Sequence, residues 1–355
     1  MIVAATLLAP LALGAMAAEA PPAAGLAPFD LADRVVYVRG SINGSRPLWL
    51  LVSSGSAGSA LDKEVAAELG LTEAPGARLD LGGAQLPLDR LAILDLSAAE
   101  DQAGHEIDAV IGYELFRRFV VEIDYYGQVL RLHEPASHRP DPRAVTLPLR
   151  IEGRRAYLNA GVELAGLAPF RRDYRLDTGM GGALSDETVR QASSPKVEIE
   201  AGGDGGQSAL TLTRARAVQL GPFRFAGANG FSGDPAIGGE LLRRFTTVID
   251  YGRGQLSLLP NRHYDDRFCF EMLGVELSVA RGTGGLVVDA IYRGSTAERA
   301  GIRVGDVLTA IDGRPVGELA LGQVRMMFGQ QNSYSLSLRR GDTARTVPVT
   351  LSPTL

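Results

Sequence analysis

Cysteine and histidine are scarce in this sequence of 355 residues, which holds 1 cysteine and 4 histidines. A single cysteine excludes an intramolecular disulfide. Because Cys269 stands between Phe268 and Phe270, the pattern predicts a small buried residue in a strand rather than a nucleophile. The histidines fall in no recognisable catalytic motif, which argues against a serine hydrolase with a histidine base. They are His105, His133, His138 and His263.

Blocks of lysine or arginine and clusters with metal-ligand spacing are also lacking. The formal net charge is -5, and no basic stripe stands out. Nucleic acid is therefore an unexpected partner, because phosphate neutralisation needs such a stripe. The acidic and histidine residues Glu100, Asp101, His105 and Glu106 are close in sequence, but their spacing predicts a solvated loop rather than a metal site. We expect neither a metal nor another cofactor.

Long apolar runs are confined to the start of the chain. Ile2–Leu13 is apolar but too short to span a bilayer comfortably. Two small-x-small patterns follow, Ala15-Met16-Ala17 and Ala18-Glu19-Ala20, as at signal-peptide cleavage sites. No Lys or Arg precedes Arg34, so the positively charged start typical of such signals is missing. We predict a signal peptide over residues 1–20, a periplasmic or secreted location and no stable membrane insertion.

What the sequence does contain is 43 glycines, a hydrophobic content of 45% and an internal repeat. Asp108–Tyr125 reads DAVIGYELFRRFVVEIDY, and Asp234–Tyr251 reads DPAIGGELLRRFTTVIDY. These segments are identical at 11 of 18 positions without gaps. Such self-similarity indicates a duplicated unit. The surrounding segments are rich in strand patterns and glycine turns, so we expect a mostly β fold.

A similar interval aligns two triplets upstream of these segments. Ser53-Ser54-Gly55 follows the apolar run Leu50-Leu51-Val52, and Asp177-Thr178-Gly179 follows Leu176. Each triplet is followed by a small-residue turn and a helix-like start, for which Asp62 and Ser185 are plausible N-caps.

These residues resemble the pepsin/retropepsin superfamily of aspartic peptidases, in particular bacterial retropepsin-like proteins with two lobes. The resemblance rests on Leu176–Gly179 and Ala236-Ile237-Gly238 in the second repeat, and on Val110-Ile111-Gly112 in the first. It implies two β-barrel lobes, a degenerate one over residues 28–134 and a second over 145–260, with a linker near residues 133–143. It also implies an interlobe cleft that binds extended polypeptide.

In this family two carboxylates share one proton, and the pair activates a water and protonates the scissile carbonyl. The implied site residues here are Asp177, Thr178 and Gly179, opposite Ser53, Ser54 and Gly55. Because Ser53 stands where the first Asp belongs, the acid-base pair is broken. Three alternatives stay open: an aspartic-type peptidase with impaired catalysis, a non-catalytic peptide-binding adaptor, and a dimer that pairs two copies of Asp177.

Other repeated charged residues have structural explanations. Asp124 and Asp250 stand at the ends of strand patterns, where a turn role is favoured over catalysis. The repeated arginine pairs, Arg117-Arg118 and Arg243-Arg244, are expected on a helix surface beside carboxylates.

The last 90 residues resemble a bacterial PDZ domain of the α+β class, with boundaries at residues 266–355. The pattern includes Gly285–Ile291, Gly294–Ala297 and Val304–Leu308. Met272, Leu273, Gly274 and Val275 fit the loop that binds a peptide carboxylate through backbone N–H groups. The facing helix is expected over Leu319–Phe328. The groove is either open to a protein C-terminus or closed by internal docking, and the glycine-rich tip Gly202–Gly206 is a candidate flap.

Overall fold

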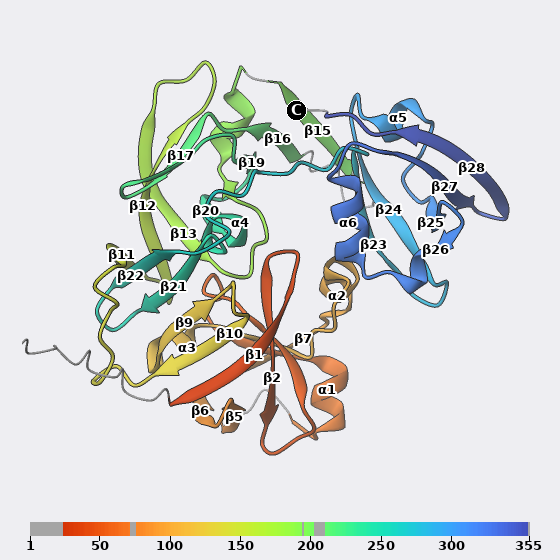
Figure 1. Cartoon of the computed structure of the whole chain (residues 1–355). Helices are drawn as coiled ribbons and strands as arrows, with labels where there is room; N and C mark the ends of the chain where they lie inside the picture. Colours follow the sequence, from red (N-terminus) through yellow and green to blue (C-terminus); the bar gives the residue numbers. More distant parts are fainter. Residues whose placement is uncertain (1–23, 72–75, 194, 202–209, 354–355) are drawn as a thin grey trace, which may run out of the picture.

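The computed structural model describes residues 24–71, 76–193, 195–201 and 210–353. The predicted signal peptide and the candidate flap at Gly202–Gly206 lie outside the described residues. The described chain is mostly β, with short helices between strands (Figure 1). The coarse fold prediction, a mostly β protein, is therefore confirmed.

A six-stranded antiparallel sheet joins the two repeats. Across the sheet the strands are β1 (Gly25–Ala32), β10 (Val129–His133), β9 (Val120–Asp124), β21 (Phe245–Asp250), β22 (Gln255–Pro260) and β11 (Val145–Glu152). The central strands β9 and β21 carry the ends of the two repeated segments. Each repeat thus lends three strands to one shared sheet.

The remaining elements of the two repeats follow similar orders. The first repeat contains β2 (Val35–Ile42), β3 (Leu48–Val52), β4 (Ser59–Asp62), α1 (Lys63–Glu68), β5 (Ala77–Leu81), β6 (Ala84–Leu88), β7 (Leu91–Leu94), α2 (Ser97–Ala103), β8 (Ala109–Ile111) and α3 (Tyr113–Arg118). The second contains β12 (Arg155–Glu163), β13 (Phe170–Asp177), β14 (Leu184–Ser185), η1 (Glu187–Gln191), β15 (Lys196–Ala201), β16 (Leu210–Arg214), β17 (Ala217–Leu220), β18 (Phe223–Phe225), β19 (Asn229–Phe231), β20 (Ala236–Gly238) and α4 (Gly239–Leu242).

Strand pairing is the same around the two triplets. In the first repeat β8 pairs parallel with β3 and antiparallel with β4. In the second repeat β20 pairs parallel with β13 and antiparallel with β14. The apolar-apolar-Gly segments therefore form the strand beside each triplet. Gly112 and Gly238 both lie where a Cβ would come within 2.4 Å of a backbone oxygen, so only glycine fits.

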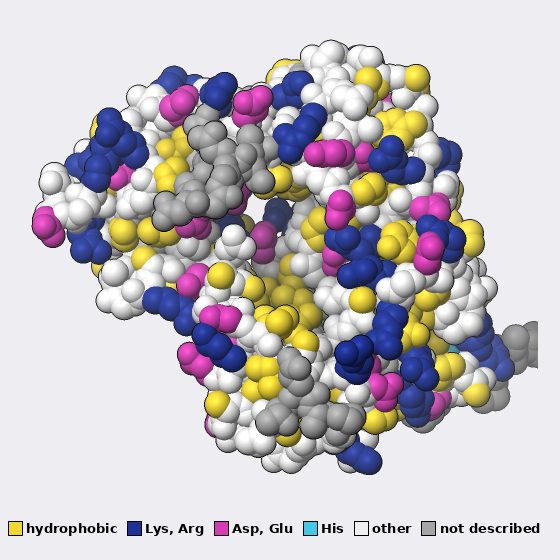
Figure 2. All heavy atoms as spheres, turned by 180° about the vertical axis from the view of Figure 1, so that it is seen from behind, with side chains coloured by type: hydrophobic (Ala, Val, Ile, Leu, Met, Phe, Trp, Pro, Cys, Tyr) yellow, Lys and Arg dark blue, Asp and Glu magenta, His cyan; other side chains and the backbone are white. Residues whose placement is uncertain are grey.

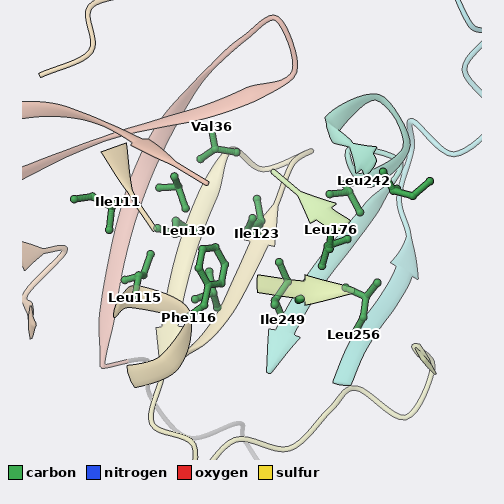
Figure 3. Close-up of a cluster of buried hydrophobic side chains, with 14 of the residues drawn as sticks. Val36, Ile111, Leu115, Phe116, Ile123, Leu130, Leu176, Leu242, Ile249 and Leu256 are labelled. Atoms are coloured by element: carbon green, nitrogen blue, oxygen red, sulfur yellow. The ribbon is translucent and has the colours of Figure 1, made fainter. Parts of the chain in front are cut away.

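One hydrophobic core extends through both repeats (Figure 3). From the first repeat, Ile111, Leu115 and Ile123 are fully buried, and from the second Leu176 and Ile249 are as well. Burial of each such side chain stabilises the fold by about 1.5–3 kcal/mol. Because these residues belong to one cluster, the two repeats share a single hydrophobic core and do not form two independent domains.

Two local predictions are corrected here. Asp62 caps α1 as expected, with its carboxylate accepting from the N–H of Glu64. The second cap is Asp186 rather than Ser185, because Ser185 is the last residue of β14 and Asp186 accepts from the N–H of Thr188. Cys269 is exposed and lies outside any strand, so the buried-strand prediction is wrong. Two flanking aromatic residues were insufficient to predict a strand.

The repeated arginine pairs also differ from one another. Arg118 pairs with Glu134 on the surface, as the helix-surface prediction requires. Arg244, in contrast, is 1% exposed and donates to Glu240 and to the carbonyls of Tyr264 and Asp266. The connection that follows β22 covers it, which local sequence does not indicate.

The C-terminal domain has its own hydrophobic core. Its elements are β23 (Val275–Ala280), β24 (Gly285–Tyr292), α5 (Thr296–Arg299), β25 (Val307–Ile311), β26 (Arg314–Pro315), η2 (Val316–Glu318), α6 (Leu321–Phe328), β27 (Ser333–Arg340) and β28 (Thr343–Thr350). It contacts both repeats: β15 pairs antiparallel with β24, and α2 lies against β23 (Figure 1). Figure 2 shows a hollow enclosed by these three parts. The stretch containing Glu100 and Asp101 is thus a docked helix rather than the expected loop.

Candidate functional site

The two triplets meet between the repeats. Ser53, Ser54, Asp177 and Thr178 are all buried. The Ser53 hydroxyl donates to Asp177 Oδ1 over 3.2 Å, and the Ser56 hydroxyl donates to Ser53 Oγ over 3.2 Å. Sequence reasoning therefore identified residues that the fold brings together from positions 124 residues apart.

Ser54 and Thr178 are linked by a reciprocal set of hydrogen bonds. The Ser54 N–H donates to Thr178 Oγ1 over 3.0 Å, and the Thr178 N–H donates to Ser54 Oγ over 3.1 Å. Each hydroxyl then donates across the interface, Ser54 to the carbonyl of Leu176 and Thr178 to that of Val52. All four groups are buried polar groups with partners, so these bonds hold the two turns in register.

Asp177 has polar partners on several sides. Its Oδ1 accepts from Ser53 Oγ and from the N–H of Gly179 at 3.0 Å. Its Oδ2 lies 3.2 Å from both Nε and an Nη of Arg175. Arg175 stands two residues before the aspartate in β13 and places a fixed positive charge against the carboxylate. Our sequence reasoning missed Arg175. Its signal is the two-residue spacing, which places side chains on the same face of a strand.

Gly55 and Gly179 allow the close approach of the triplets. A Cβ on Gly55 would lie 2.2 Å from Asp177 Oδ2, and one on Gly179 would lie 2.6 Å from Ser53 Oγ. Neither glycine has a positive φ. Glycine is therefore needed at both positions because the facing side chain leaves no space for a Cβ, and not because of the backbone conformation.

Each repeat also sends a hairpin tip to the other repeat. Arg34, between β1 and β2, forms an ion pair with Glu240 at the start of α4. Arg154, between β11 and β12, lies 4.0 Å from Glu114 at the start of α3. The two acidic residues occupy equivalent positions in the repeated segments. These crossed contacts lie beside the triplets, since Arg155 donates to the carbonyl of Gly55.

The histidines are engaged elsewhere. His105 stacks on Tyr37 with ring centroids 4.1 Å apart, and His133 lies 2.8 Å from a Glu122 oxygen. His138 packs beside the His133 ring, and His263 contacts Asp266. In the described part of the chain, these contacts tie every histidine to residues other than the site serines.

The predicted carboxylate-binding loop adopts a concave shape that is already filled. The N–H groups of Leu273, Gly274 and Val275 all donate to the Glu271 carboxylate. The Leu273 and Val275 bonds measure 3.0 and 3.1 Å, and Gly274 has a φ of +84°. Three N–H groups that converge on one carboxyl group form a nest. Met272 instead donates its N–H to the carbonyl of Phe328, so it ties the loop to α6.

A separate cavity of about 360 Å³ lies away from the triplets. Its lining comes from the end of β16, from β18 and the turn after it, from the residue Arg244 that follows α4, and from the segment that leads to the C-terminal domain. It includes the four arginines Arg214, Arg224, Arg244 and Arg267. Among the described residues, we found neither a cluster of metal-ligating side chains nor a helix long and apolar enough to cross a membrane.

Comparison with known proteins identifies the C-terminal region. Residues 287–333 match the family model described as PDZ domain. The C-terminal domain is a PDZ domain. The match runs from β24 past the end of α6 and does not include the filled nest itself. Three matched elements bond to the nest loop: the N–H of Tyr292 in β24 donates to the carbonyl of Gly274, that of Ala297 in α5 donates to the carbonyl of Leu273, and the carbonyl of Phe328 in α6 accepts from Met272.

One curated relative is the putative serine protease HhoA of Synechocystis sp.. It is 39% identical over 206 residues, which is 58% of this chain and 47% of the relative. The chain thus spans about half the length of this relative. The printed name of this relative is that of a putative serine protease, and neither comparison supports an aspartic peptidase for this chain.

Proposed function

We propose that the protein is an exported polypeptide-binding protein of the aspartic-peptidase type that hydrolyses peptide bonds inefficiently. On this proposal residues 28–134 and 145–260 are the two lobes, and residues 266–355 are the PDZ domain. Extended polypeptide lies between the lobes, and a protein C-terminus is the ligand of the PDZ groove. The N-terminal apolar segment supports export to the periplasm or beyond.

The observation that carries this proposal is the set of hydrogen bonds that Ser54 and Thr178 make around a single carboxylate, Asp177; we call this set the polar frame. The reciprocal bonds of Ser54 and Thr178 keep the two triplets opposed, with Ser53 Oγ 3.2 Å from Asp177 Oδ1. Two carboxylates at that separation would share a proton, whereas a serine hydroxyl only donates to Asp177. Arg175 contacts the same carboxylate and competes for the oxygen that would activate water. The frame therefore favours binding over general acid-base catalysis.

A serine nucleophile is the second candidate. The HhoA likeness favours it, as does the hydroxyl chain from Ser56 through Ser53 to Asp177. In this mechanism Ser53 Oγ would attack the carbonyl carbon and give its proton to Asp177, and Asp177 would pass that proton to the amine that leaves as the C–N bond breaks. Water would then hydrolyse the acyl-serine ester and restore the hydroxyl of Ser53. Without an imidazole the base is a carboxylate, which is a weaker proton acceptor than histidine near neutral pH.

One set of full-length variants tests these alternatives on a fluorescein-labelled unfolded protein between pH 3 and pH 8. Anisotropy reports binding, and release of fluorescent peptides reports cleavage. We expect the wild type to bind and to cleave slowly at most. S53D should gain at least about 10²-fold in cleavage at acid pH, because it restores the second carboxylate. S137D, which adds a carboxylate at an exposed serine, is the matched control.

The contrary outcomes are distinct. Efficient wild-type cleavage that D177N abolishes and S53A preserves would replace the binding proposal with an active one-carboxylate peptidase. Cleavage that S53A abolishes, together with labelling of Ser53 by a fluorophosphonate, would establish the serine nucleophile. Absence of binding in every variant would overturn the polypeptide-binding proposal itself.

A further inference from the structure

The PDZ groove carries a contact that the proposed function does not use. A peptide carboxylate bound in such a loop needs the backbone N–H groups at its base. Here the N–H groups of Leu273, Gly274 and Val275 are all committed to Glu271. Glu271 lies only two residues before the nest begins, so its carboxylate reaches these donors without any other segment.

The strand edge of the groove is also occupied. β23 pairs with β24, and α6 packs against it as the other wall. Arg325 of α6 reaches across and donates to the carbonyl of Leu277 in β23 over 3.0 Å. A peptide added as a strand would donate to carbonyls of this kind. Arg325 therefore takes one of the acceptors that such a peptide would use.

Helix α2 of the first repeat covers the same region. Arg325 donates to the carbonyl of Gln102 over 2.8 Å and pairs with Asp33 at the β1–β2 tip. Gly104, which ends α2, lies so close to α6 that a Cβ would come within 2.5 Å of Leu321 Cβ. On the far side of α2, Arg281 pairs with both Glu100 and Asp101. The helix is thus fixed to both walls of the groove.

We infer that Glu271 is a built-in ligand of the carboxylate nest and that α2, fixed through Arg325, covers the adjoining groove. A protein C-terminus binds only when it displaces both. The occupied groove is the closed form of the PDZ domain, and displacement releases α2 from it. This inference rests on the PDZ part of the proposed function, because it names the regulation of that peptide site.

Charge in and around the nest makes the closed form sensitive to pH. Burial raises the pKa of the Glu271 carboxyl to about 8, despite the opposing effect of the N–H donors. The charged and titratable groups that act on this region are Glu276 of β23, Asp289 and Tyr292 of β24, Arg325 of α6 and Asp33 of the β1–β2 tip. A displaced Glu271 regains its ordinary pKa near 4.5. The closed form therefore binds a proton more readily and is weakened as the pH rises from about 4.5 through 8.

Hydrogen exchange of the full-length protein tests the internal ligand without any peptide. In E271A we expect the amides of Leu273, Gly274 and Val275 to exchange at least 10-fold faster than in the wild type. The amide of Tyr292, which donates to the carbonyl of Gly274, should not change, and it shows that the loop remains folded. E318A removes an exposed glutamate of the same domain and is the control. Unchanged exchange in E271A would overturn the inference.

Peptide binding tests the covered groove. The probe is a pool of hexapeptides randomised at the last four positions, with free or amidated C-termini. We expect E271A and R325A each to retain at least 10-fold more of the free-carboxylate pool than the wild type, with no gain for the amidated pool. R339A, at an exposed arginine of β27, should behave as the wild type. Wild-type binding should tighten between pH 6 and pH 9, whereas E271Q, which does not titrate there, should lack this dependence.

The two experiments separate failure of this inference from failure of the proposed function. Strong wild-type binding, equal to that of both variants, would overturn the closed groove while leaving a peptide-binding PDZ domain. Faster exchange in E271A without peptide binding in any variant would overturn the PDZ part of the proposed function, and the displacement step with it. Faster exchange with a gain in E271A alone would exclude α2 as a cover.

Discussion

The first and second repeats keep the same frame around different central residues. Ser54 and Thr178 exchange equivalent hydrogen bonds, and both triplets end in a glycine that the facing side chain requires. The residue that differs is the one that carries the chemistry, Ser53 against Asp177. The frame holds the repeats together through buried bonds, and its stability does not depend on a second carboxylate.

The hairpin tips show a second difference between the repeats. Glu240 receives Arg34, Arg243 and Arg244, so its carboxylate is fully engaged. Glu114 accepts from Ser59, and its Oε1 has Arg154 at 4.0 Å but no hydrogen-bond partner. The glutamate at this repeated position is therefore the centre of a network of three arginines in the second repeat, whereas in the first repeat it has one arginine at 4.0 Å.

The largest expected effect on stability comes from replacing the two glutamates, Glu240 and Glu114, each by glutamine. E240Q leaves the buried Arg244 guanidinium without its carboxylate, and we expect a loss of about 3–5 kcal/mol in the free energy of unfolding. E114Q keeps an acceptor for Ser59 and should cost less than about 1 kcal/mol. Urea unfolding followed by Trp49 fluorescence measures both. Equal losses would show that the two networks are equivalent in solution.

The next effect concerns the reciprocal bonds. S54A and T178V each remove a hydroxyl that makes two buried hydrogen bonds, and each should cost about 2–3 kcal/mol. Because the two hydroxyls bond to the same pair of turns, the double variant should lose less than the sum. The same urea unfolding assay gives the coupling energy. Strict additivity would contradict a shared frame.

A smaller effect distinguishes the two glycines. G55A places a methyl group against Asp177, and G179A places one against Ser53, so each should cost about 1–3 kcal/mol through overpacking. Adding S53G to G179A removes the atoms that the new Cβ would meet, and stability should recover. Thermal unfolding of the single and double variants is the measurement. A double variant no more stable than G179A would show that the facing serine is not the obstacle.

The smallest effect is a dependence on pH. Burial alone would raise the pKa of Glu240, but Arg34, Arg243 and Arg244 outweigh it and hold this pKa below its ordinary value of 4.5. The stability that this carboxylate contributes is complete above pH 4.5 and is lost as the pH falls through its lowered pKa. The difference in unfolding free energy between wild type and E240Q should therefore narrow below pH 4.5. A constant difference down to pH 3 would assign the stabilisation to another group.

Sequence predicted the repeat-based parts of the molecule best. The duplicated segments predicted which strands lie beside Ser53 and Asp177. They could do so because both copies of the sequence pattern fold into the same local packing. The turn role of Asp124 and Asp250 also holds, since each accepts from a backbone N–H three residues later. These features depend on neighbours within a few residues or on the repeat itself.

Features that depend on distant segments were missed. Arg244 is buried because the connection after β22 folds over it, and α2 is a docked helix because β23 and α6 lie against it. The role of Glu271 as an internal ligand was missed for a similar reason. It depends on the fold of the following loop, which places three N–H groups around the Glu271 carboxyl group. Cys269 shows the opposite error. The triplet Phe268-Cys269-Phe270 has the residue pattern of a strand, but it forms no strand and Cys269 is exposed.

The pairing of β15 with β24 has a mechanical consequence when it is combined with the docking of α2. The first repeat touches the second, the second touches the PDZ domain, and the PDZ domain touches the first, so the three parts close a ring. In a ring no part swings on a single hinge. If the PDZ domain releases α2, the ring opens on the side of the first repeat. The PDZ domain then stays joined to the second repeat by the β15–β24 pairing and by the connecting segment between β22 and β23, and it can turn about that junction.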